Sequence, residues 1–283
     1  MLNAFYLITI ILGVAIQGIV KKPYTQKTGS NGVYIFSAMM SAVALLFFAV
    51  TATSFRFDWS FVPYSVAFAA SYAAALVFMV LAVANGSLAL SSLFVSYSLM
   101  IPTLYGLFVL HDPIGLGLII GLILLCISLF LVNKTNENAK ISFKWVVFAT
   151  LSLIGNGMCT VVQKMQQLAS GGAYKNEFMM VALAIVCACM LVMSLSCERR
   201  YLLSSARCGW HLAVLCGAMN GIVNLFTMIL SGRMAVSLMF PLISVGGLVI
   251  TYLVSKFWYK ETLCATQTWG FLLGLAAVVC LNL

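Results

Sequence analysis

Apolar residues fill the chain in blocks of about helix length, and short polar breaks separate one block from the next. A helix needs roughly 20 apolar residues to cross the hydrocarbon core of a bilayer, and each block comes close to that length. No polar stretch is long enough to fold as a separate domain outside the membrane. We therefore predict an all-α integral membrane protein with ten transmembrane helices, over residues 3–20, 32–53, 61–84, 87–109, 114–132, 143–165, 177–196, 209–230, 235–256 and 264–282.

The second half of the chain repeats features of the first half. Ser98-Leu-Met-Ile-Pro102 and Ser237-Leu-Met-Phe-Pro241 are near copies, and each lies in an apolar run with a proline inside it. A polar break and then a Gly-x-x-x-Gly helix follow each copy. Further pairs, at an offset of 142 residues, are Gly13 with Gly155 and Lys22 with Lys164. An ordered series of such matches indicates two structurally similar halves.

The number of blocks in each half predicts how the halves are related. Five blocks precede the longest polar break and five follow it. Because five is odd, the second half must enter the membrane in the opposite sense. We therefore predict two inverted five-helix repeats, residues 1–134 and 143–283, joined by a linker at residues 135–142. Most lysines and arginines follow odd-numbered helices, which by the positive-inside rule places both termini outside the cell.

Composition and charge exclude several functional classes. The chain has 283 residues, of which 63% are hydrophobic and 7% are charged. Its net charge of +9 reflects few acids and basic residues at membrane edges, so we expect no nucleic-acid partner. The nine cysteines contain no Cys-x-x-Cys, and we expect neither a metal site nor a cofactor. No base, nucleophile and metal ligands converge in the pattern, so we do not expect an enzyme.

Ionisable residues avoid the centres of the apolar blocks. All six acids lie at or near predicted helix ends, and neither His111 nor His211 is central. Proton coupling usually needs a carboxylate or a histidine within the membrane, so we expect uniport or exchange instead. We expect Lys22 and Lys164 to anchor helix ends at the membrane interface, with steering of an anion as the alternative.

The ten predicted helices, their two halves and one turn motif resemble a known family. Lys260-Glu261-Thr262 resembles the acidic turn that follows the fourth helix of a repeat in EamA-type transporters of the drug/metabolite transporter superfamily. The first half departs from this pattern, because its turn reads His111-Asp112-Pro113, with Asp in place of Glu. The resemblance implies transport of small metabolites through a cavity lined by the first, third and fourth helices of each repeat. It also implies cytoplasmic termini, against the charge pattern, and the sidedness stays open.

Polar side chains within the apolar blocks indicate where a solute could bind. Serines and threonines seven residues apart share one helix face, amides offer both donors and acceptors, and aromatic rings can stack on a solute. Helix packing and interhelical hydrogen bonding remain the alternative roles for all of them. The predicted solute-binding residues are Gln17, Tyr72, Tyr97, Ser98, Asn156, Asn220, Asn224, Ser244 and Thr251, and the predicted hinges are Pro102 and Pro241.

These observations favour a membrane carrier. We expect it to move a small polar metabolite (an amino acid, amine, sugar or nucleoside-like solute) by alternating access around a site midway through the membrane. The alternatives are a flippase for a lipid intermediate and a scaffold protein on the same fold. We expect the cell membrane as its location and lipids as its surroundings. The Gly-x-x-x-Gly helices could support a homodimer or packing within the chain.

Overall fold

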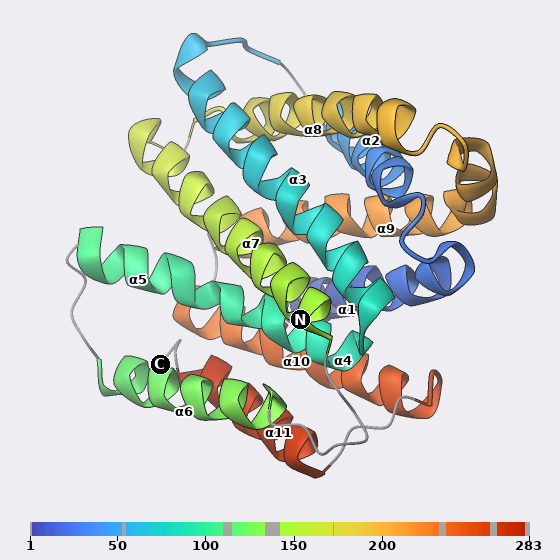
Figure 1. Cartoon of the computed structure of the whole chain (residues 1–283). Helices are drawn as coiled ribbons and strands as arrows, with labels where there is room; N and C mark the ends of the chain where they lie inside the picture. The colour runs from blue at the N-terminus through green and yellow to red at the C-terminus, as the bar shows by residue number, and fades with distance from the viewer. Residues whose placement is uncertain are drawn as a thin grey trace.

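Every regular element that the structure describes is a helix. The computed structural model describes residues 2–52, 55–109, 115–133, 142–171, 173–231, 236–260 and 265–280. The helices, shown in Figure 1, are α1 (Leu2–Thr28), α2 (Val33–Thr51), η1 (Trp59–Phe61), α3 (Val62–Asn85), α4 (Leu88–Ser96), η2 (Tyr97–Leu99), α5 (Met100–Val109), α6 (Leu116–Asn133), α7 (Phe143–Ala169), α8 (Lys175–Cys197), α9 (Leu202–Ser231), α10 (Val236–Phe257) and α11 (Ala265–Cys280). An all-α fold, as predicted, is therefore confirmed for these residues.

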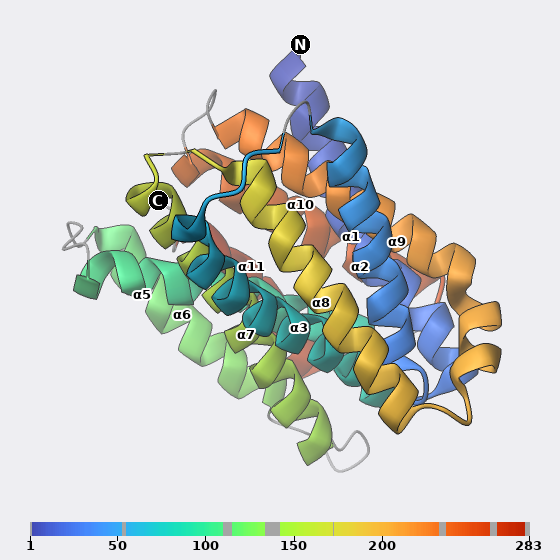
Figure 2. The same cartoon turned by 90° about the horizontal axis from the view of Figure 1, so that it is seen from above.

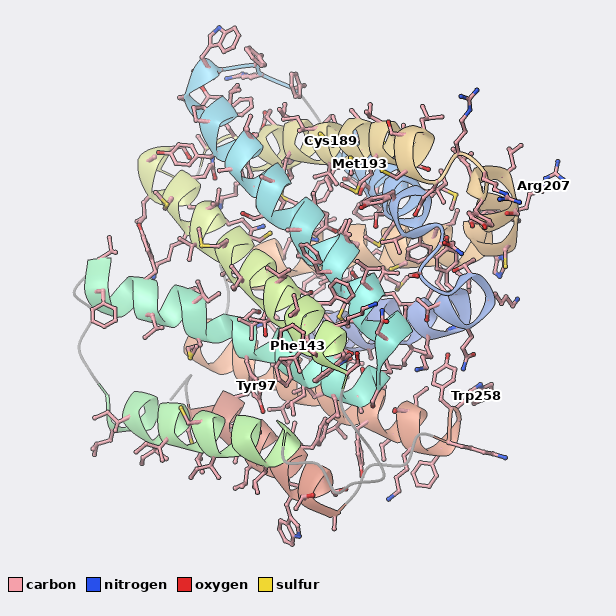
Figure 3. All side chains as sticks on the ribbon, in the orientation of Figure 1. Tyr97, Phe143, Cys189, Met193, Arg207 and Trp258 are labelled. Atoms are coloured by element: carbon pink, nitrogen blue, oxygen red, sulfur yellow. The ribbon has the colours of Figure 1, made fainter. Side chains whose placement is uncertain are left out.

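Length and composition make this a multi-pass membrane protein. Among the described residues, six helices are long and apolar enough to cross a membrane: α1, α2, α3, α7, α8 and α9. Large apolar side chains also face outward, as Ile123 of α6 does with 55% of its surface exposed. Trp258, which Figure 3 shows at the end of α10, is 79% exposed. Apolar helix faces with tryptophan at their ends suit a lipid surrounding better than water.

The helices pack in a pattern that mixes the two halves of the chain. In Figure 1, α3 lies along α7 across the front, and α6 and α11 form a pair below them. Figure 2 shows the same bundle from above, with α1 beside α9 and α2 between α8 and α9. α10 packs against α1 and α4, and α7 packs against α4, η2 and α5. Most of the large helix contacts therefore join one half to the other.

Glycines allow the closest of these contacts. A Cβ atom at Gly155 of α7 would lie 2.7 Å from the backbone nitrogen of Ala75 and 2.8 Å from the carbonyl oxygen of Ser71, both in α3. A Cβ atom at Gly13 of α1 would likewise lie 2.6 Å from a Val223 methyl group of α9. Gly13 and Gly155 are the pair that the sequence offset matches. Each of them lets the first helix of one half approach the third helix of the other half.

A buried carboxylate joins α8 to α2. Glu198, at the end of α8, is 6% exposed and accepts hydrogen bonds of 3.0 Å from the backbone N–H groups of both Tyr34 and Ile35. These N–H groups belong to the first turn of α2 and have no partner within that helix, so a negative charge is favourable there. Gly32, which precedes α2, has a φ of 85°, a conformation that favours glycine. The end of α8 therefore lies against the start of α2.

A second polar contact joins α6 to α11. Ser128 of α6 donates a hydrogen bond of 2.6 Å to the carbonyl oxygen of Gly270 and also bonds the hydroxyl of Tyr97. A Cβ atom at Gly274 would lie 2.8 Å from the Ser128 hydroxyl oxygen. The Gly-x-x-x-Gly motif of α11 is thus used for packing within the chain.

The helices differ from the predicted segments in two respects. α1 continues past residue 20 to Thr28, and α9 begins at Leu202 instead of 209, because backbone hydrogen bonds continue beyond the apolar residues. The segment predicted as one helix over residues 87–109 is divided by the 3-10 turn η2. Pro102 has no N–H group to bond the carbonyl of Ser98 four residues earlier, which weakens the α-helix at this point.

Some predicted features fall outside the described residues. They are the linker at residues 135–142, apart from its last residue, and the turns His111-Asp112-Pro113 and Glu261-Thr262.

The close approach at Gly155 generates a stability prediction. Gly155→Ala places a methyl group against rigid α3 backbone, so we expect the free energy of unfolding to fall by about 1–3 kcal/mol. The measurement is thermal unfolding of the purified protein in detergent. Gly115→Ala is the matched control, because no atom of the described residues lies within 4 Å of a Cβ atom there. Equal melting temperatures for the two variants would contradict the close α3–α7 contact.

Candidate functional site

Polar side chains line the contact between α1 and α9. Gln17 and Lys21 lie four residues apart on α1, and Cys216, Asn220 and Asn224 follow at the same spacing on α9. Residues at this spacing share one face of a helix. We name these five residues the α1/α9 seam; Figure 2 shows the two helices that carry it side by side. The seam joins the first helix of one half to a helix of the other.

Hydrogen bonds run along the seam. Asn220 donates its side-chain N–H to the Gln17 carbonyl oxygen Oε1 at 3.0 Å. Asn224 donates to the Asn220 backbone oxygen at 2.9 Å and lies 3.3 Å from its Oδ1. Cys216 donates to the Gln17 backbone oxygen at 3.8 Å and lies 3.1 Å from the sulfur of Met40 in α2. The amides therefore bond mainly to one another.

Tyr72 of α3 brings an unpaired hydroxyl to the seam. Its hydroxyl lies near the Asn220 side chain and within electrostatic range of Cys216 and of Cys159 in α7. Among the described residues, however, this buried hydroxyl has no partner at hydrogen-bonding geometry. The ring stacks on Phe68 with 5.5 Å between centroids, and it packs against two clusters of buried hydrophobic residues. Tyr72 thus places a free donor and acceptor between α7 and α9, near the middle of the bundle.

Lys21 places a buried basic group at the seam. It is 8% exposed, and its ammonium group is close enough to Cys216 to interact electrostatically. No hydrogen bond or ion pair holds it within the described part of the chain. Lys21 directly follows the first predicted helix, residues 3–20, but in the structure α1 continues past it to Thr28. The signal that could have found it is its spacing of four residues from Gln17.

A second polar contact joins η2 to α7. Asn156 donates a hydrogen bond of 2.8 Å from its side chain to the Ser98 hydroxyl oxygen. Beside it, a Cβ atom at Gly157 would lie 2.8 Å from the Ser98 carbonyl oxygen. That carbonyl is the one that Pro102 cannot bond. The 3-10 turn of the first half is therefore held by the first helix of the second half.

The structure separates the predicted site residues into groups. Gln17, Tyr72, Asn220 and Asn224 come together at the seam, and Ser98 meets Asn156 at η2. Figure 3 shows Tyr97 between the α4–α5 segment and the α6/α11 pair, where its hydroxyl bonds Ser128. The remaining two predicted residues, both on α10, lie apart from these contacts.

Thr251 and Ser244 lie seven residues apart on α10, which packs against α1. Thr251 is buried, and its hydroxyl oxygen would lie 3.8 Å from a Cβ atom at Gly18 of α1. Ser244 is half-buried and follows Ile243, which packs in a cluster with residues of α1 and α9. No hydrogen bond of the Ser244 side chain occurs within the described residues. Thr251 therefore lies in the packing of α1 on α10.

The two predicted hinge prolines have different surroundings. Pro102 lies in α5, directly after the 3-10 turn, so the helix is interrupted beside it. Pro241 lies inside α10, which runs as one α-helix from Val236 to Phe257. The two halves thus differ at this position, although their sequences are nearly the same there.

The groups at the seam can bind a solute. Amide, hydroxyl and ammonium groups recognise a solute by hydrogen bonds and charge. Within the described residues no group of three or more His, Cys, Asp or Glu side chains could hold a metal ion. The polar groups also lie inside the bundle, where the surrounding side chains are apolar and electrostatic interactions are strong.

Comparisons with known proteins identify the fold without a function. No family model and no curated protein matches the sequence. Fifteen chains of solved structures match in three dimensions. One of them is a crystal structure described only as that of a protein; it has a TM-score of 0.61 and 15% identity, over 98% of this chain and 96% of that chain. At this identity the likeness shows a shared fold alone.

The bond between Gln17 and Asn220 generates a testable coupling. Gln17→Leu or Asn220→Leu alone leaves a buried amide unpaired, which costs about 1–3 kcal/mol, whereas replacing both partners is nearly neutral. We therefore expect each single variant to melt at a lower temperature than the Gln17→Leu/Asn220→Leu protein, in thermal unfolding in detergent. Strictly additive effects would show that the two amides do not depend on one another.

Proposed function

We propose that the protein is a carrier that moves a small polar solute across the membrane by alternating access. The observation that carries this proposal is the α1/α9 seam, which places hydrogen-bonding groups of both halves near the middle of their helices. Gln17 is the sixteenth of the 27 residues of α1, and Asn220 is the nineteenth of the 30 residues of α9. Midplane sites at the contact of two repeats are typical of carriers.

The packing pattern supports two repeats of five helices, with α4, η2 and α5 counted as one. If each helix is replaced by its counterpart in the other half, the contact of α3 with α7 becomes the contact of α9 with α1. In the same way, the contact of α2 with α9 becomes the contact of α8 with α3. The contact of α1 with α10 likewise becomes that of α7 with α4, η2 and α5. All of these contacts occur. A chain without internal symmetry has no reason to repeat its helix contacts in this manner.

Helix directions support the inverted relation and ten membrane spans. The end of α8 lies against the start of α2 through Glu198, and Ser128 late in α6 bonds Gly270 early in α11. The corresponding helices of the two halves thus run antiparallel in both pairs. Two halves of opposite direction follow naturally when each contains an odd number of spans.

Several groups at the seam remain available to a solute. Among the described residues, the Gln17 side-chain N–H groups, the Asn224 side-chain oxygen and the Tyr72 hydroxyl have no partner that occupies them. A polar group in this surrounding is costly unless it faces a partner or a wet space. A solute with complementary hydrogen-bonding groups would supply that partner.

The EamA-type transporters of the drug/metabolite transporter superfamily are the family that we propose. The paired halves, the Lys260-Glu261-Thr262 motif and the exchange symmetry of the helix contacts support the assignment. The first and third helices of the halves carry the seam, as the family resemblance implies for its cavity. We propose the cell membrane as the location.

Uptake into liposomes tests the proposal. Purified protein in liposomes should take up at least one solute from a panel of amino acids, amines, sugars and nucleosides, in a saturable manner. Asn224→Ala should reduce that uptake about tenfold or more, because it removes a hydrogen-bonding group that the seam offers to the solute. Asn85→Ala is the matched control, because Asn85 is exposed at the end of α3 and bonds only its own helix at Leu81.

The same assay identifies the competing functions. Uptake that does not saturate would indicate a leak. Absence of uptake combined with movement of labelled lipids between leaflets would favour the flippase, and absence of both would favour the scaffold.

A further inference from the structure

Lys21 occupies an unusual position for a lysine in a membrane helix. Gly13, Gln17 and Lys21 follow one another at four-residue spacing on the face of α1 that meets α9. Lysines near helix ends usually extend toward the membrane surface. The next residue, Lys22, donates a hydrogen bond of 3.2 Å to the Gly86 carbonyl oxygen at the end of α3. Lys21 is 8% exposed, and its side chain is within electrostatic range of Cys216 in the seam.

The acidic residues that the structure describes are all engaged elsewhere. Asp58 accepts a hydrogen bond of 2.7 Å from the Ser60 backbone at the start of η1. Glu177 lies 3.4 Å from the Arg56 backbone nitrogen, and Glu198 bonds the start of α2. None of the three pairs with Lys21. The ammonium group therefore has no compensating charge in this part of the chain.

An uncompensated buried charge is costly, and it persists where a function requires it. Among the groups around Lys21, the Cys216 thiol is a weak partner. One turn away, the Gln17 amide has free donors, and beyond it the Tyr72 hydroxyl is unpaired. The arrangement is a positive charge at one end of a row of neutral donors and acceptors. Its chemical complement is an oxyanion joined to a neutral hydrogen-bonding body.

We propose that Lys21 binds the anionic group of the transported solute, a carboxylate or a phosphate, while Gln17, Asn220 and Tyr72 bind its uncharged part. The solute then neutralises Lys21 when it enters the seam, and its release restores the unpaired charge. This assignment, which rests on the proposed carrier function, favours acids and amino acids over amines and uncharged sugars.

Matched ligand pairs test the charge requirement directly. The probes are lactate with lactamide, and glycerol 3-phosphate with glycerol, titrated against the purified protein with thermal unfolding as the readout. We expect one anion of these pairs to raise the melting temperature at a concentration about tenfold or more below its uncharged partner, because a hydrogen bond to a charged group is the stronger one. The carboxylate and phosphate arms distinguish the two oxyanions. Equal responses within both pairs would overturn the proposal.

Substitution of Lys21 provides the second test. Lys21→Gln should abolish the preference for the anion, whereas Lys27→Gln, an exposed lysine on the same helix, should preserve it. Lys21→Met should also raise the melting temperature of the ligand-free protein by a few degrees, because it removes an unpaired buried charge. A fall in that temperature would mean that Lys21 has a structural partner, and the proposal would be wrong.

Binding and uptake distinguish this proposal from the carrier function. Anion binding that depends on Lys21, without saturable uptake, would support the anion site and contradict the carrier function. Saturable uptake of uncharged solutes that is unaffected by Lys21→Gln would support the carrier function and contradict the anion site.

Discussion

Water is absent from the core of a bilayer, so every polar group there needs a partner within the protein or its ligand. The backbone meets this constraint by forming helices in all the long apolar segments. Side chains meet it by bonding across helix contacts, as Asn220 does with Gln17 and Asn156 does with Ser98. Each of these bonds also joins the two halves of the chain. The polar groups therefore determine which helices meet as much as the apolar ones do.

The contacts between the halves combine close packing with incomplete polar pairing. Gly13 and Gly155 bring backbones together, which gives dispersion contacts that persist in lipid as well as in water. A few turns away, the seam contains the buried Lys21, and the Tyr72 hydroxyl beside the seam has no partner among the described residues. Packing holds the bundle together, and in the carrier that we propose the unpaired groups bind the solute. Such a carrier needs both, because its halves must stay joined while its site changes partners.

The sequence predicted part of the candidate site for a physical reason. Amides are rare and costly in apolar helices, so Gln17, Asn156, Asn220 and Asn224 could be recognised without a structure, and each of them makes a hydrogen bond within the bundle. The serine and tyrosine predictions were less selective. Hydroxyls are tolerated in many helix contacts, and Tyr97 bonds Ser128 in the α6/α11 pair, away from the seam. The sequence pattern did not single out Lys21, because basic residues at the end of an apolar block usually mark the membrane surface.

By itself, the sequence determined the all-helical class and most helix positions, because hydropathy and proline act locally along the chain. It also indicated that Gly13 and Gly155 are a pair, since the two glycines match at an offset of 142 residues. Only the tertiary structure decided that α1 continues far enough to bury Lys21, that Asn220 meets Gln17 some 200 residues away, and that the 3-10 turn at Ser98 lies under Gly157. Partners of this kind depend on how helices rotate and cross, which is settled by packing among all of them.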